Sequence, residues 1–178
     1  MMDLRVQPEG VKGVRISGIE PYMVNCLLGA IEILEEADSS PARERLYPKP
    51  TAHDDKANAE WQRLVASELR HLFVTAGETV ARDLTALKAD RRNPALSELC
   101  FPAEHVNAWM SVLNGARLVL GAVFDVTEVD MNAVNFEVLD KRTIGVMKIH
   151  LLGHLLQLFV QLESGESAEP SDEPETSV

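Results

Sequence analysis

The sequence has few cysteines, and the two it has, Cys26 and Cys100, lie far apart and beside apolar residues. Neither belongs to a CxxC pair or a Cys/His cluster, the spacing that zinc sites use. We therefore interpret both as buried free thiols in a reducing compartment, with a disulfide or a reactive thiol as the alternative.

Positive charge is also scarce. Lys and Arg number 17 against 28 Asp and Glu, which gives a net charge of −11. Residues 164–178 are acidic and contain no Lys or Arg, and the rest of the chain is acidic as well. Nucleic acids and anionic membrane surfaces both attract basic proteins, so neither is expected as a partner.

Long apolar runs are missing. No uninterrupted run approaches the roughly 18 residues of a membrane-spanning helix. The first residues, MMDLRVQPEG, lack the apolar stretch of a signal peptide. These absences predict a cytoplasmic protein.

Motifs that mark common chemistries are absent too. The sequence has no GxSxG, no GxGxxG, no GxxxxGK[ST] and no HExxH. We therefore assign no catalytic residue and no cofactor, and an enzyme is the less favoured class.

The composition itself is globular, with 46% apolar and 25% charged residues in 178. Residues 1–163 are expected to form a single helical domain. Residues 164–178, rich in Ser, Glu and Pro, are expected to be a disordered acidic tail.

Hydrophobic periodicity predicts a mainly α fold with about four core helices and a small N-terminal β-hairpin. Ser17 and Glu20 have capping-box spacing, with Glu20 as a rival cap before Pro21, and Asp140 is a plausible N-cap. Residues 88–101 are expected to be a linker, and residues 125–140 are ambiguous. The predicted elements are the hairpin at about 3–16 and helices at about 18–37, 57–87, 102–124 and 141–162.

The connector, residues 38–56, contains three prolines, and Arg43, Arg45 and Lys49 give it local positive charge. Proline opposes a helix interior, so we expect a loop. A solvated loop is the preferred interpretation, and a mobile segment that docks a partner is the alternative.

The third predicted helix contains polar residues close to its apolar side. On a helical wheel Arg117 lies on the shoulder of the apolar arc, with Asn114 just beyond it. Glu68 is the matching anomaly within the apolar stripe of the second helix. We predict a buried polar lock of Glu68, Asn114 and Arg117, in which the carboxylate fixes the guanidinium. A ligand pocket around Arg117 is the alternative.

Two further groups of residues are candidates for chemistry. His150 and His154 lie four residues apart, a spacing that can chelate a metal, but no third ligand shares their face. Asp83 with Glu68 could form a carboxylate pair for acid–base chemistry. We favour structural interpretations: a solvent- or partner-facing histidine stripe, and pairing of these carboxylates with Arg117 or Arg70.

The segment AWMSVLNGARLVLGAVFDVTE resembles the bacterial domain of unknown function 2017 family. Its members carry a similar W-x3-LN-x2-R-x2-LG pattern, which falls here on Trp109, Leu113, Asn114, Arg117, Leu120 and Gly121. The resemblance extends over roughly residues 3–162. It implies a small, mainly helical cytoplasmic protein without an assigned activity or accepted catalytic residues. In some actinobacteria such genes lie beside that of the Clp protease adaptor.

Taken together, these features favour an accessory protein that binds another protein. The alternative is a metal- or small-molecule-binding helical protein that uses His150 and His154. A homodimer formed through the polar stripe of the last helix, which holds these two histidines with Gln157 and Gln161, is a third possibility.

Overall fold

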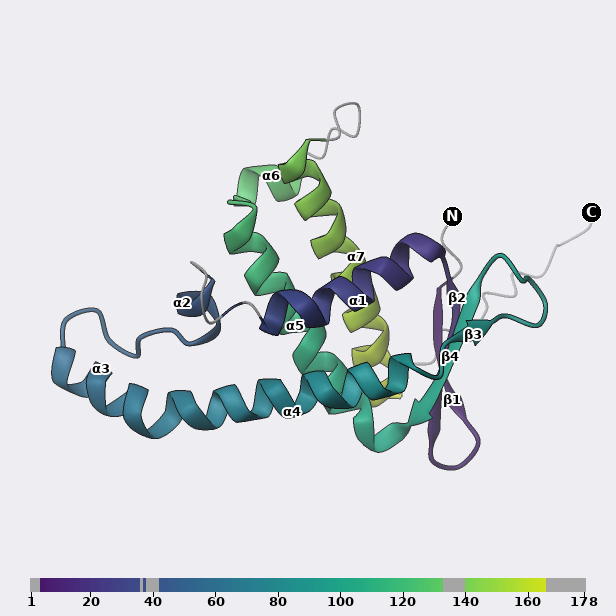
Figure 1. Cartoon of the computed structure of the whole chain (residues 1–178), viewed down its shortest axis with the longest axis horizontal. Helices are drawn as coiled ribbons and strands as arrows, with labels where there is room; N and C mark the ends of the chain where they lie inside the picture. The colour runs from purple at the N-terminus through teal and green to yellow at the C-terminus, as the bar shows by residue number, and fades with distance from the viewer. Residues whose placement is uncertain (1–3, 36, 38–41, 133–139, 166–178) are drawn as a thin grey trace, which may run out of the picture.

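The computed structural model describes residues 4–35, 37, 42–132 and 140–165. Helices α1 (Pro21–Glu35), α4 (Ser67–Leu84), α5 (Val106–Val123) and α7 (Lys141–Ser164) form the body, and a small sheet lies at one end (Figure 1). The predicted mainly α fold with an N-terminal hairpin is confirmed. The acidic tail lies outside the described residues from position 166 onward.

The hairpin belongs to a four-stranded antiparallel sheet of order β1-β2-β4-β3. Its strands are β1 (Arg5–Glu9), β2 (Gly13–Ile19), β3 (Lys88–Ala89) and β4 (Ser97–Pro102). The prediction of a linker over 88–101 was therefore wrong. Leu99 and Phe101 of β4 alternate with polar neighbours, so they face the core beside Ile16 and Val14 of β2.

Two predicted helix caps have different outcomes. Asp140 is confirmed as the N-cap of α7, because its carboxylate accepts a hydrogen bond from the Thr143 N–H at 2.7 Å. Ser17 lies inside β2, so the predicted capping box with Glu20 does not form. Helix α1 instead begins at Pro21, a residue suited to the first turn.

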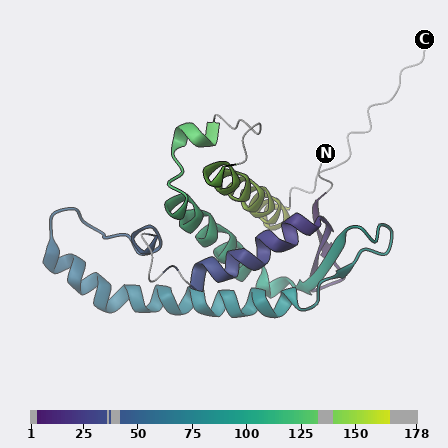
Figure 2. The same cartoon turned by 45° about the horizontal axis from the view of Figure 1, so that its top comes forward.

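The second predicted helix is a long arm. Helix α3 (Asp55–Trp61), a π-helical turn η2 (Gln62–Ala66) and α4 follow one another as one rod, and its α3 end projects away from α5 and α7 (Figures 1 and 2). A π-helical turn contains more residues than an α-helical turn. The side chains of α4 that face the body are therefore not those that one continuous α-helix would present.

Part of the connector packs against the body. Helix α2 (Arg43–Leu46) ends in Leu46, which is buried, as are Ala42 and Tyr47. These residues form a second apolar cluster with Val119 of α5, and the Tyr47 ring meets Phe73 edge-on at 6.1 Å. Ala42, Leu46 and Tyr47 therefore anchor this part of the connector to the body, while Arg43, Glu44 and Arg45 between them are exposed. Residues 38–41 lie outside the described part.

Helix α7 runs through the centre of the body and packs most closely against α5. By length and composition alone it is long and apolar enough to cross a membrane, the one such helix in the described residues. The helix still holds no uninterrupted apolar run of that length, because Lys148, His150, His154 and Gln157 interrupt it. Burial of Leu152, Leu155 and Phe159 against the other helices accounts for its apolar composition, since a core helix meets the same test.

Gly145 of α7 allows a close approach to the end of α5. A Cβ at this position would lie 2.7 Å from Cγ and 2.8 Å from Cβ of Phe124. We expect Gly145→Ala to destabilise the fold by about 1–3 kcal/mol through overpacking, despite the better helix propensity of alanine. Urea denaturation measures the loss.

Gly29 of α1 is the matched control, because a Cβ there meets nothing within 4 Å. Gly29→Ala should leave the stability unchanged or raise it by up to about 1 kcal/mol. Equal effects of the two substitutions would contradict the close packing at Gly145.

Candidate functional site

A polar groove lies between α5 and α7. Arg117 contributes from α5, and His150, His154 and Gln157 contribute from successive turns of α7. Met131 of the short helix α6 (Glu128–Asn132), Ile149 and Gly153 complete the lining of a hollow of about 340 Å³. The predicted polar stripe of the last helix thus faces the residue that the sequence singled out on α5.

Arg117 is half-buried, and no protein group fixes its guanidinium. Its Nε is enclosed without a hydrogen-bond acceptor, and no ion pair reaches this side chain from the described residues. The guanidinium lies against Gly153, where a Cβ would come within 3.2 Å of Nε. An arginine carries five N–H donors, so this one holds unused hydrogen-bonding capacity in the groove.

The predicted lock of Glu68, Asn114 and Arg117 is not formed. Glu68 and Asn114 are both exposed to solvent. Leu69 and Phe73 pack in the apolar cluster around Val119 of α5, and Glu68 is rotated away from them. The wheel grouped Glu68 with Leu64 and Leu72, but these two side chains are themselves 50% and 62% exposed. The side of α4 that meets the body carries Leu69, Phe73, Ala76 and Val80 instead.

The buried carboxylate of α4 is Asp83, near the other end of that helix. It accepts a hydrogen bond from Trp109 Nε1 at 2.9 Å, and its two oxygens lie 2.9 and 3.1 Å from His105 Nδ1. The predicted pairing of Asp83 with Glu68, Arg117 or Arg70 was wrong. His105 closes the short 3₁₀ turn η3 (Ala103–His105), four residues before Trp109, so both groups share one face.

We call Asp83, His105 and Trp109 the buried polar triad. The Asp83 carboxylate contacts both the Trp109 indole and the His105 imidazole, and the triad thereby ties α4 to the start of α5.

No metal centre stands out in the described part of the chain, since no group of three or more His, Cys, Asp or Glu side chains comes together there. His150 and His154 supply two imidazoles, and the Arg117 guanidinium shares their groove. A cation beside it would be repelled, so the groove suits a metal poorly.

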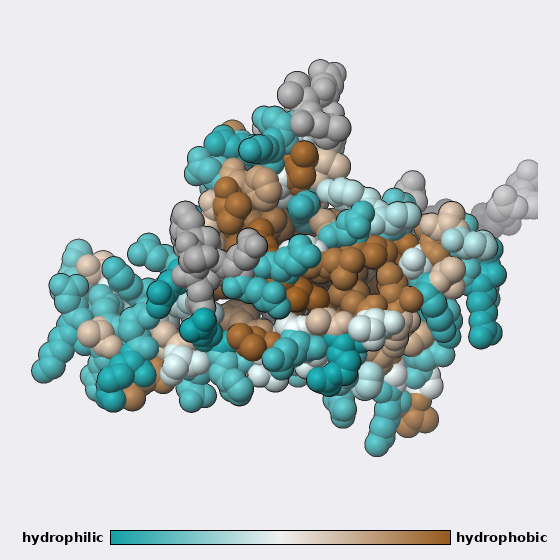
Figure 3. Space-filling view, viewed as in Figure 1, coloured by the Kyte–Doolittle hydropathy of each residue, from teal (hydrophilic) through white to brown (hydrophobic). Residues whose placement is uncertain are grey.

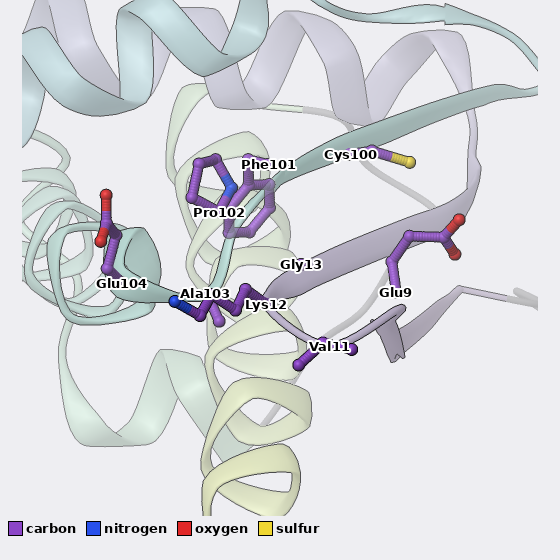
Figure 4. A pocket seen from close by; sticks show the side chains of 9 residues that line it. All are labelled: Glu9, Val11, Lys12, Gly13, Cys100, Phe101, Pro102, Ala103 and Glu104. Carbon is purple, nitrogen blue, oxygen red and sulfur yellow. The ribbon is translucent and has the colours of Figure 1, made fainter.

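A second hollow of about 760 Å³ lies where the hairpin meets the end of β4. Figure 4 shows that its charged side chains, Glu9, Lys12 and Glu104, point in different directions. Glu9 is engaged outside the hollow, where Arg15 donates two hydrogen bonds to it and holds the pKa of this carboxyl below its usual value. The hollow therefore presents no convergent set of groups.

The two thiols differ in exposure. Cys26 is buried in α1, and burial raises its pKa, which keeps the thiol protonated and unreactive. Both thiols are free, as the sequence interpretation has it, but Cys100 is half-buried on β4 and not buried. Cys100 lies opposite Arg15 of β2 and lines the second hollow.

Comparison with known proteins gives one finding. A family model described as a domain of unknown function, DUF2017, matches residues 25–163, more than half of the chain. No curated protein and no solved structure gives a match.

Proposed function

Because the chain belongs to the DUF2017 family, which carries no assigned activity, we propose from its surface that it is a non-catalytic accessory protein that docks another protein. The observation that carries this proposal is an apolar face on α1. Val24, Leu28 and Ile31 follow one another at helical spacing along one flank of α1, where Val24 and Ile31 also pack against the edge of the core.

The α1 face is centred on Leu28, a large apolar side chain that the fold leaves exposed. Leu28 is 46% exposed, and Val24 and Ile31 are half-buried around it. Figure 3 shows hydrophobic side chains gathered over α1 on this side of the molecule. A continuous apolar patch on an acidic protein fits a partner with an apolar contact surface.

Leu28→Ser should weaken partner binding by roughly tenfold, because it removes the centre of the apolar contact. The free energy of unfolding should change by no more than about 0.5 kcal/mol, since the side chain is half exposed. The partner is recovered with the immobilised full chain from an extract of the native cell, and its binding is then measured with purified components.

The matched control is Leu72→Ser, because Leu72 is 62% exposed on the arm, away from α1. The α1 face is the docking surface if Leu28→Ser loses the recovered partner and Leu72→Ser keeps it. If both variants retained the partner equally, the contact would lie elsewhere on the surface. Failure to recover any partner would count against a role in protein–protein interaction.

The first partner to test is the Clp protease adaptor, because its gene lies beside those of similar proteins in some actinobacteria. We propose that the two proteins meet in the cytoplasm. Calorimetric titration of the purified adaptor into the full chain decides this point alone. Light scattering decides whether a second copy of the chain binds the α1 face.

The alternative function is the binding of a metal or a small molecule at His150 and His154. A small molecule is the better supported of the two, because Arg117 shares their groove.

A further inference from the structure

The groove between α5 and α7 differs in charge from the rest of the protein. The chain has a net charge of −11, yet the described residues that line the groove include one guanidinium and no carboxylate. Asp130 of α6, the neighbour of Met131 in the sequence, pairs with Arg142 at 3.7 Å. A local positive site on an acidic surface attracts anions from solution.

The side chains of the groove are donors of hydrogen bonds. Arg117 offers only N–H groups, and among the described residues no acceptor lies within hydrogen-bonding distance of its buried Nε. His150, His154 and Gln157 are exposed along one face of α7, and each carries an N–H donor that can turn toward the same hollow. A ligand that matches this set is rich in acceptors and negatively charged.

The position of Gly153 fits a held guanidinium. Without a side chain at 153, the Arg117 guanidinium lies directly on the backbone of α7, between the turns that carry His150 and Gln157. Packing therefore orients the planar donor group before any ligand arrives. A planar fork of N–H donors pairs with two oxygens of a carboxylate or a phosphate.

We propose that this groove binds an oxyanion, a carboxylate or phosphate group of a small ligand, with Arg117 as the anchoring residue. His150, His154 and Gln157 supply further hydrogen bonds to the same group. The site is separate from the α1 face, so it stands whether or not that surface docks a partner.

The test is an NMR titration of the full chain with inorganic phosphate and, separately, with succinate, at constant ionic strength maintained with sodium chloride. We expect saturable shifts of the backbone amides around 117 and 150–157 with at least one of the two anions, and the anion that binds identifies the ligand class. Absence of saturable shifts with both, or equal shifts with chloride alone, would overturn the proposal.

Three variants assign the site. Arg117→Gln should weaken binding by roughly tenfold or more. Arg63→Gln, an equal change of charge on the exposed η2 turn, should leave it unchanged. Gly153→Ala should fold at least as well but bind more weakly, because its Cβ at 3.2 Å from Nε displaces the guanidinium. Unchanged binding in both Arg117→Gln and Gly153→Ala would refute the assignment.

Discussion

Asp83→Ala is expected to lower the free energy of unfolding by roughly 2–4 kcal/mol. Asp83 is 7% exposed and accepts hydrogen bonds from Trp109 and His105, so its loss leaves the buried indole N–H without an acceptor. A buried donor without a partner loses its hydration and gains nothing in return. Urea denaturation, with the slope of the transition compared between variants, gives the change.

Glu68→Ala is the control for that experiment. Glu68 lies on the same helix and carries the same charge, but it is exposed and holds no structural contact with Arg117. Its removal should change the stability by no more than about 0.5 kcal/mol. If Glu68→Ala were as damaging as Asp83→Ala, the assignment of the buried polar triad would fail.

Trp109→Ala should be more damaging still, at about 3–5 kcal/mol. The side chain is fully buried, stacks on Phe101 with ring centroids 5.1 Å apart, and lies 6.0 Å from the ring of Phe159. It therefore joins the sheet, α5 and α7 in one aromatic cluster. Its replacement opens a large cavity where three layers meet, and thermal or urea unfolding measures the cost.

Trp109→Phe separates the packing from the hydrogen bond. Phenylalanine keeps an aromatic ring in the cluster but cannot donate to Asp83, so a smaller loss of about 1–3 kcal/mol is expected. Trp61→Ala on the arm, where the indole is half-buried, should also cost less than Trp109→Ala. Equal losses for both tryptophans would contradict the central place of Trp109.

The sequence predicted the helical elements well because their apolar residues recur at a constant period. The ends of α7 were placed within two residues, since Asp140 is a strong cap and the apolar run is long. Strand β4 was missed because only Leu99 and Phe101 carry its alternation, and the nearby Asn93 and Pro94 suggested a loop. Short strands depend on partners that lie far away in sequence.

The candidate site was predicted only in part. The wheel placed Arg117 correctly on the shoulder of the apolar face, and the stripe of His150, His154 and Gln157 was recognised on the last helix. That these two features face one another depends on the crossing of α5 and α7, which no local pattern encodes. The four-residue spacing of His105 and Trp109 indicates that their side chains share one helix face. That Asp83 is their common partner can be known only from the tertiary fold.

The most direct test of this account is the free energy of unfolding of Arg117→Gln in the full chain. The structure gives the core its polar anchor at Asp83, whereas the buried Nε of Arg117 has no hydrogen-bond acceptor among the described residues. We therefore predict a change of no more than about 1 kcal/mol. A loss of roughly 3–5 kcal/mol, the cost of breaking a buried ion pair, would show that Arg117 is a structural lock after all and would contradict the account.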